Sequence, residues 1–184
     1  MNSKILFVTS LLMLAAMAGG LLHADTSTQA ADRNFPTEAT KLLKEIQSTA
    51  TKLSHSADTL HSYRHGVSWQ SHANELNLVK EHINTIGDRL EKLKAIRHAA
   101  EPWQKRAIDS ILPVGLVTAA RTDAAIRHLT DAPNYLWAPA YTEHLECIAL
   151  GAHQMKQSID LHLEMSSTQN KLEELRDKAA AIGS

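Results

Sequence analysis

Apolar residues recur every three or four positions along most of this chain, and this spacing predicts long amphipathic helices. Because 3.5 residues are close to one helical turn, each such run places its apolar side chains on one face. We call that face the seam of a helix. The first seam consists of Ala39, Leu43, Ile46, Ala50, Leu53, Ala57 and Leu60. The second consists of Leu76, Val79, Ile83, Ile86, Leu90 and Leu93.

Prolines mark the start of the other two predicted helices, at Pro102 and Pro139, since proline is tolerated in a first helical turn. Gly66 is expected to end the first helix, and Ser68 or Ser71 to cap the second. The third seam consists of Ile108, Leu112, Gly115, Ala119, Thr122, Ile126 and Leu129. The fourth consists of Tyr141, Leu145, Ile148, Ala152, Met155 and Ile159. Pro113 lacks a backbone donor, so we expect a kink or a break there.

The end of the fourth helix departs from its own pattern. After Ile159 the seam turns polar at three positions, His162, Ser166 and Gln169. An apolar stripe then resumes out of phase, at Leu172, Leu175, Ala179 and Ile182. Either the helix extends beyond the rest of the domain or it breaks near residues 166–167.

Composition argues against a β fold. The chain has only seven Gly and five Pro, and 4% aromatic residues, whereas sandwiches and barrels need many turns and favour aromatic strands. Four apolar stripes with short connections bury one another when they face a common axis. The sequence therefore predicts an all-α fold, an up-down-up-down antiparallel four-helix bundle with an extended or broken C-terminal helix, forming one domain over residues 36–182.

The first 24 residues have the pattern of a cleaved secretory signal peptide. Lys4 precedes an uncharged apolar run over residues 5–18, and Leu22 and Ala24 suit a signal peptidase site before Asp25. The alternative is a retained anchor, because residues 5–22 just reach membrane-spanning length. Residues 25–35 are expected to be a disordered leader. We therefore expect an exported protein, periplasmic or secreted, with no stable membrane anchor once the signal is removed.

Several function classes are disfavoured by what the chain lacks. Its formal charge is −1, without the basic excess that binding to nucleic acid requires. Its single cysteine, Cys147, excludes an internal disulfide and covalently attached haem. Met155 and Met165 share one predicted helix, which argues against a non-covalent haem held by Met and His from different helices. No Glu-x-x-His occurs, although a carboxylate-bridged di-iron site would need it on two helices. Cys147 and His144 lack an orienting third group, so we expect no enzyme.

Histidine is the compositional exception, with 11 residues in the chain. An antiparallel bundle brings the turn between the first two helices and the loop over residues 131–138 to the same end. Ten histidine and aromatic residues are then expected there, namely His61, His65, His72, His128, His144, Tyr63, Trp69, Tyr135, Trp137 and Tyr141. Any functional site is expected at this end.

Four of these histidines are candidate metal ligands: His61, His65, His72 and His144. His61 and His65 are four residues apart, which would place both rings on one side of a helix, and Asp58 could add an oxygen. Zinc, copper or nickel would accept such an imidazole-rich set. The alternative is that these are solvated histidines at an aromatic-capped bundle end.

The sequence leaves three hypotheses of function. The first is a non-catalytic binding protein that uses the out-of-phase stripe to contact an unknown protein partner or a second copy. The second is a transition-metal binding or buffering protein using the histidine-rich end. The third is a small apolar ligand held near Gly87, Gly115 and Gly151, which fall at similar heights in their helices. Close helix packing is the competing interpretation of these glycines, because protein interiors are densely filled.

Overall fold

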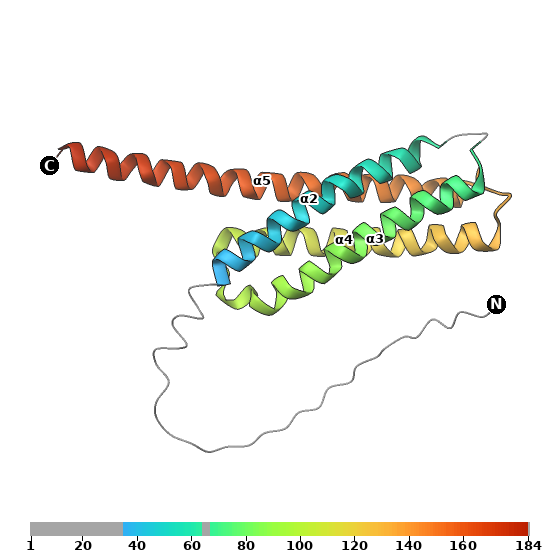
Figure 1. Cartoon of the computed structure of the whole chain (residues 1–184), viewed down its shortest axis with the longest axis horizontal. Coiled ribbons are helices and arrows are strands. Elements are labelled where there is room, and N and C mark those ends of the chain that lie inside the picture. Colours follow the sequence, from blue (N-terminus) through green and yellow to red (C-terminus); the bar gives the residue numbers. More distant parts are fainter. Residues whose placement is uncertain (1–34, 64–66, 184) are drawn as a thin grey trace, which may run out of the picture.

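The computed structural model describes residues 35–63 and 67–183, and these residues form an all-α bundle (Figure 1). Four long helices make up the bundle in this part of the chain. They are α2 (Phe35–Ser62), α3 (Trp69–Ile96), α4 (Pro102–Asp131) and α5 (Pro139–Gly183). A short 3-10 helix, η1 (Arg97–Ala99), follows α3 directly. No strand occurs among the described residues.

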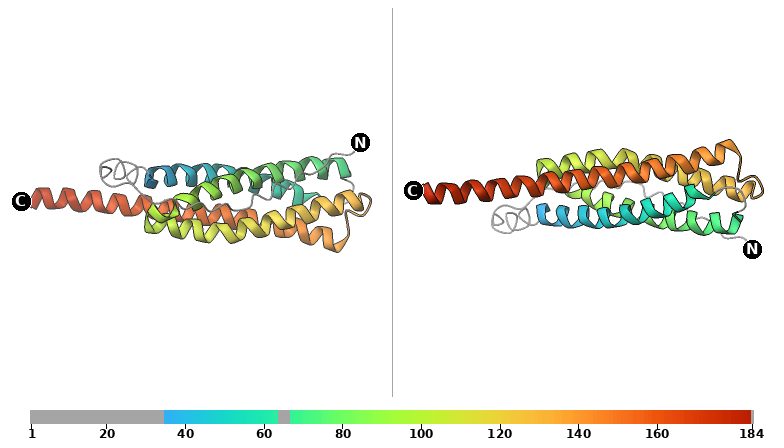
Figure 2. Two further views of the ribbon diagram at one scale, coloured as in Figure 1. Left: turned by 90° about the horizontal axis from the view of Figure 1, so that it is seen from below. Right: turned by 90° about the horizontal axis from the view of Figure 1, so that it is seen from above.

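The four helices run up, down, up and down, as the sequence predicts (Figures 1 and 2). The α2–α3 connection and the α4–α5 loop lie at one end, which we call the loop end. Because α5 is 45 residues long and α3 is 28, α5 projects well past the opposite end of the bundle. The extended alternative for the last helix is therefore correct, and no break occurs near residues 166–167.

Local sequence signals account for most helix boundaries. The hydroxyl of Ser68 accepts a hydrogen bond from the Ser71 backbone at 3.3 Å and caps α3. At the start of α4, the Gln104 side chain accepts from the Glu101 backbone N–H at 2.8 Å. Two boundaries differ slightly from expectation: α2 begins at Phe35, within the predicted leader, and ends at Ser62, before Gly66.

The predicted seams of α2, α3 and α5 form the core. Every one of their 19 positions is buried, with exposures of 8% or less. Leu43, Ile46, Ile148 and Met155 are fully enclosed. A 3.5-residue apolar repeat is thus sufficient to identify the buried face of these helices.

The predicted seam of α4 is partly wrong. Leu112, Ala119 and Ile126 are only half-buried. The residues immediately before them, Ile111, Thr118 and Ala125, take the core positions instead. Thr118 tolerates burial because its hydroxyl donates to the Val114 carbonyl at 2.8 Å. The helix also runs through Pro113 without a break, and this proline is exposed.

Candidate functional site

The loop end holds a cluster of histidine and tyrosine rings in contact with one another. The ring of His128 stacks on Tyr141 with centroids 5.0 Å apart. His72 lies edge-on to Tyr63 at 5.1 Å and 5.6 Å from Tyr141. Since these residues come from all four helices or their ends, the cluster ties the loop end together. The expected gathering of histidines and aromatics is present for these four residues.

His72 is the centre of this cluster and is 3% exposed. Its Nδ1 lies 2.9 Å from the Tyr141 hydroxyl, which satisfies both buried polar groups. Burial lowers the pKa of His72 and raises that of Tyr141, because each charged form would lose its hydration. Both side chains are therefore neutral at pH 7, and His72 serves as a core hydrogen-bonding group.

The structure does not bring His61, His72 and His144 together into a group that could hold a metal ion. The helix that would place His61 and His65 on one side ends at Ser62. His65 itself lies outside the described residues. His61 is exposed, while His72 is bonded to Tyr141. Among residues 35–63 and 67–183, no three His, Cys, Asp or Glu side chains form a group that could hold a metal ion. The metal hypothesis stays a prediction, with no geometric support from the described ligands.

His144 has a cationic neighbour. Its Nδ1 lies 3.3 Å from Nη1 of Arg121, which also pairs with Glu143 at 3.3 Å. Partial burial and the charge of Arg121 lower the pKa of His144. A guanidinium at this distance would repel a metal ion bound to the same imidazole. His144 therefore belongs to the polar contact between α4 and α5.

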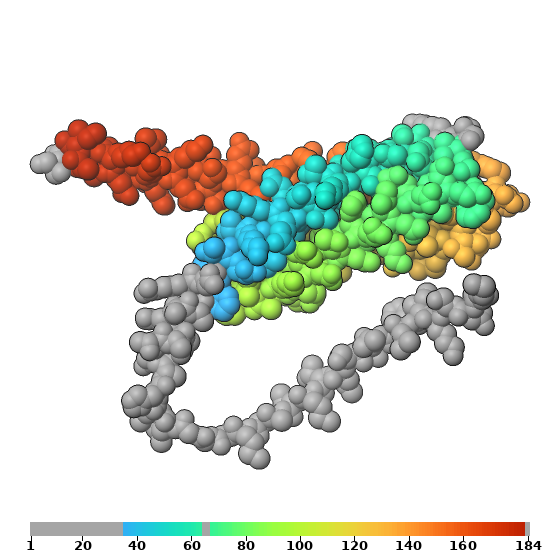
Figure 3. Space-filling view, in the orientation of Figure 1, coloured from blue at the N-terminus to red at the C-terminus, as the bar shows by residue number. Residues whose placement is uncertain are grey.

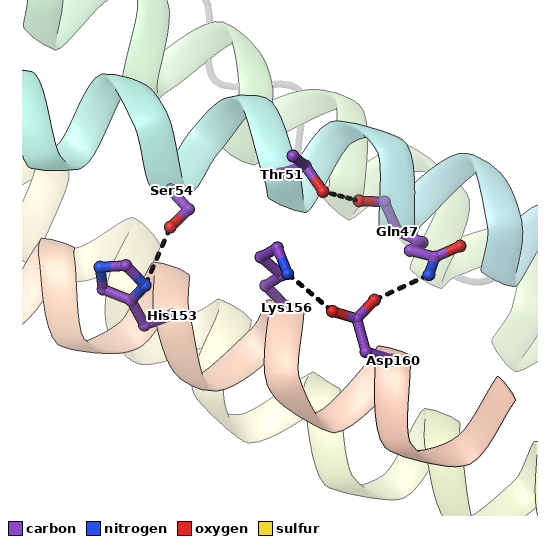
Figure 4. A network of polar contacts seen from close by, with 6 residues as sticks. All are labelled: Gln47, Thr51, Ser54, His153, Lys156 and Asp160. Carbon is purple, nitrogen blue, oxygen red and sulfur yellow. Dashed lines mark hydrogen bonds and ion pairs between the residues drawn. The ribbon is translucent and has the colours of Figure 1, made fainter. Parts of the chain in front are cut away.

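A row of polar contacts along the α2–α5 interface was not anticipated from the sequence (Figure 4). Gln47 donates to Asp160 at 2.7 Å, and Lys156 donates to the other carboxylate oxygen at 2.7 Å. Desolvation raises the pKa of Asp160, but the hydrogen bonds from Lys156 and Gln47 outweigh it, so the net shift is downward. Of these contacts, only the pair of Lys156 and Asp160 could be expected from the sequence, because the two residues are four positions apart on one helix.

The same interface contains a Ser-His-Asp constellation. His153 Nδ1 lies 3.0 Å from the Ser54 hydroxyl, and its Nε2 lies 2.7 Å from Asp58. Such an order of groups can activate a serine. Here Ser54 sits inside α2 with 6% exposure, so its hydroxyl has little room for a substrate carbonyl. We interpret the three residues as a bridge between α2 and α5. Ser54 and Asp58 are four residues apart, but nothing in the sequence pairs them with His153.

The three mid-height glycines have different surroundings. A Cβ at Gly151 would collide with the hydroxyl of Thr118, so α4 and α5 pack closely there. Gly87 is exposed, with nothing within 4 Å of the position its Cβ would take. Gly115 borders Gly87 across an open groove of about 520 Å³ between α3 and α4, whose floor includes Ile86 and Leu90. Gly151 is not among the residues that line this groove. Close packing is correct for Gly151 and wrong for Gly87.

The end of α5 projects past the other helices of the bundle (Figure 1). Every residue from 167 to 182 is exposed. The out-of-phase stripe includes Leu172 at 50%, Leu175 at 62% and Ile182 at 87% exposure. At 1.5 Å per residue this segment is about 25 Å long. An amphipathic helix of this length, anchored in a folded bundle, can pair with a second helix.

Comparison with known proteins yields no relative: no family model, no curated protein and no solved structure matches the chain. None of the helices in the described part of the chain combines the length and apolar character needed to cross a membrane.

Proposed function

We propose that this protein is an exported, non-catalytic binding protein that recognises another helix through the projecting part of α5. The observation that carries the proposal is the exposure of Leu172, Leu175 and Ile182 on one side of the part of α5 that extends past the end of the bundle (Figure 1). Burying one such side chain is worth roughly 1.5–3 kcal/mol. Several of them aligned along one face favour association with a complementary apolar surface.

Export is supported by the sequence of residues 1–24, where a short basic start, an apolar run and a small-residue site occur in the order of a signal peptide. Mass spectrometry of the protein from its native compartment tests this part. A mature chain beginning at Asp25 is expected. A retained Met1 would instead favour the anchor alternative.

The binding role is tested by photo-crosslinking in the native host. A benzophenone amino acid replaces Leu175 on the stripe or, as the control, Asp177 on the opposite side of α5. Irradiation is expected to give one defined adduct from position 175 and none from position 177. That adduct should disappear when Leu172 and Ile182 are replaced by glutamine, which keeps the helix but removes the apolar stripe. Equal adducts from both positions, or no adduct from either, would overturn the proposal.

A further inference from the structure

We propose that the partner of the projecting helix is a second copy of this chain, paired with it in antiparallel orientation. This inference rests on the binding role proposed above and names the partner. It is carried by an apolar seam that is longer than the stripe seen in the sequence, together with the charges on one flank of that seam. The second seam of α5 consists of Leu161, Met165, Thr168, Leu172, Leu175, Ala179 and Ile182.

The second seam starts inside the bundle, on the outer side of α5. Leu161 is 55% exposed and Met165 is 44% exposed, although the neighbouring Ile159 is fully buried. Two residues correspond to about 200° around a helix, so the second seam faces away from the bundle core. Figure 3 shows the projecting segment free of other helices in this view. The seam is thus continuous over 22 residues and can accept a helix along its whole length.

The spacing of the second seam is that of a coiled coil. Its seven positions are separated by four, three, four, three, four and three residues, which is a heptad repeat over three heptads. Only Thr168 interrupts the apolar series. Heptad spacing keeps a seam in contact with a second helix over this length, whereas the 3.6-residue period of a straight helix would drift away from it.

The charged flanks argue against a parallel pair. In a parallel coiled coil, each residue just before the a position meets the residue just after the next d position of the partner. This rule places Lys171 against Arg176 of the second copy, and the contact occurs twice by symmetry. The same rule sets Glu164 against Gln169, which is neutral. A parallel dimer would therefore contain two like-charge contacts and no attractive ion pair.

An antiparallel pair centred near residue 170 matches the pattern of the chain. In this arrangement Met165 would pack against Leu175 of the second copy, and Leu161 against Ala179 of the second copy. On one flank Glu164 would meet Lys178 of the second copy. Glu164 and Lys178 lie at equal distances on either side of Lys171, so the same pair forms twice. Self-complementarity of this kind is what a twofold contact between identical chains requires.

The present contacts of these charges do not compete strongly with pairing. Lys178 is bonded to Glu174 one turn earlier, with both side chains 64% exposed, and an exposed pair of this kind contributes little free energy. Lys171 would meet its own copy at the twofold axis. It is exposed, so both ammonium groups can extend into solvent.

Sedimentation equilibrium on the chain from Asp25 to Ser184, over a range of protein concentrations, tests the proposal. A concentration-dependent dimer is expected, and Leu172→Gln with Leu175→Gln should abolish it. Glu164→Lys should weaken the dimer by roughly three- to tenfold in Kd, because two attractive contacts become repulsive. The double variant Glu164→Lys with Lys178→Glu should restore the original affinity. The control Asp177→Lys makes the same charge change on the opposite side of α5 and should have no effect.

Each other outcome overturns a stated part of the proposal. A dimer that ignores Glu164→Lys, or that the double variant does not restore, is not antiparallel in this register. A chain that stays monomeric at its highest soluble concentration does not pair with a second copy. The binding role would survive that last result if position 175 still crosslinks to a different protein, so the two failures are distinguishable.

Discussion

Gly151 and Gly87 are both helical glycines near mid-height, yet they should respond to the same substitution in opposite directions. Gly151→Ala inserts a methyl group against Thr118, whose Cβ is 3.3 Å from the new atom and whose branched side chain has little freedom to move. We expect a loss of about 1–3 kcal/mol in the free energy of unfolding, as for other overpacked sites. Urea denaturation measures it.

Gly87→Ala is the matched control. Nothing lies within 4 Å of the new methyl group, so only helix propensity changes and the protein should gain up to about 1 kcal/mol. Thr118→Ser combined with Gly151→Ala should recover part of the loss, because serine has more rotamer freedom than threonine. If both glycine variants were equally destabilised, the close approach at Gly151 would be refuted.

His72 gives the fold a dependence on pH. Burial lowers the pKa of His72 in the folded state, so below its ordinary value of about 6.5 the unfolded chain binds a proton that the folded chain resists. The free energy of unfolding should therefore fall as the pH decreases from about 7.5 to about 5. His72→Gln retains a partner for the Tyr141 hydroxyl but does not titrate, so its pH dependence should be flatter.

Other histidines also make the free energy of unfolding depend on pH, so His72→Gln should remove only part of that dependence. Burial also lowers the pKa values of His82, His144 and His162. A His72→Gln variant with the full slope of the original protein would show that the buried imidazole is not the group responsible.

At the level of elements, the two halves of α5 differ in how much they contribute to the core. Its first half, through Ile159, supplies core residues, and its last turns supply none. Deletion of residues 170–184 should thus change the free energy of unfolding by less than about 0.5 kcal/mol at concentrations where the protein is monomeric. Met155→Ala, at a fully buried position in the first half, should lose about 2–5 kcal/mol. Chemical denaturation compares the two, and a large loss on deletion would mean that the projecting segment packs on the bundle.

The contrast between α4 and the other helices shows where periodicity stops being informative. In α2, α3 and α5 one stripe is clearly more apolar than its neighbours, so its burial follows from the sequence. In α4 two adjacent stripes are comparably apolar, one through Leu112 and one through Ile111. The outcome depends on Thr118, which packs against Gly151 of α5. That contact joins residues 33 positions apart, and no local pattern contains it.

At the scale of the whole molecule, the shape follows from the unequal lengths of the helices. A continuous α5 of 45 residues is about 67 Å long, whereas the 28 residues of α3 span about 42 Å. Small-angle scattering of the monomer should show a maximum dimension that decreases by about 20 Å when residues 170–184 are removed. An unchanged dimension would mean that the helix bends back along the bundle in solution.

The sequence by itself determined the helical class, the order and approximate ends of the helices, and the buried face of three of them. These features depend on spacing, capping groups and proline positions, which act within a few residues of each other. It also predicted that the rings of Tyr63, His72, His128 and Tyr141 gather at the loop end, because an antiparallel topology follows from short connections.

Only the tertiary structure decided which polar groups meet. It paired His72 with Tyr141, His153 with Ser54 and Asp58, and Arg121 with His144. It also decided that α5 continues beyond the bundle and that its second seam includes Leu161 and Met165. The physical reason is that a side-chain contact between helices depends on axial offset and rotation, which arise from the packing of the whole core. Local periodicity does not encode either quantity.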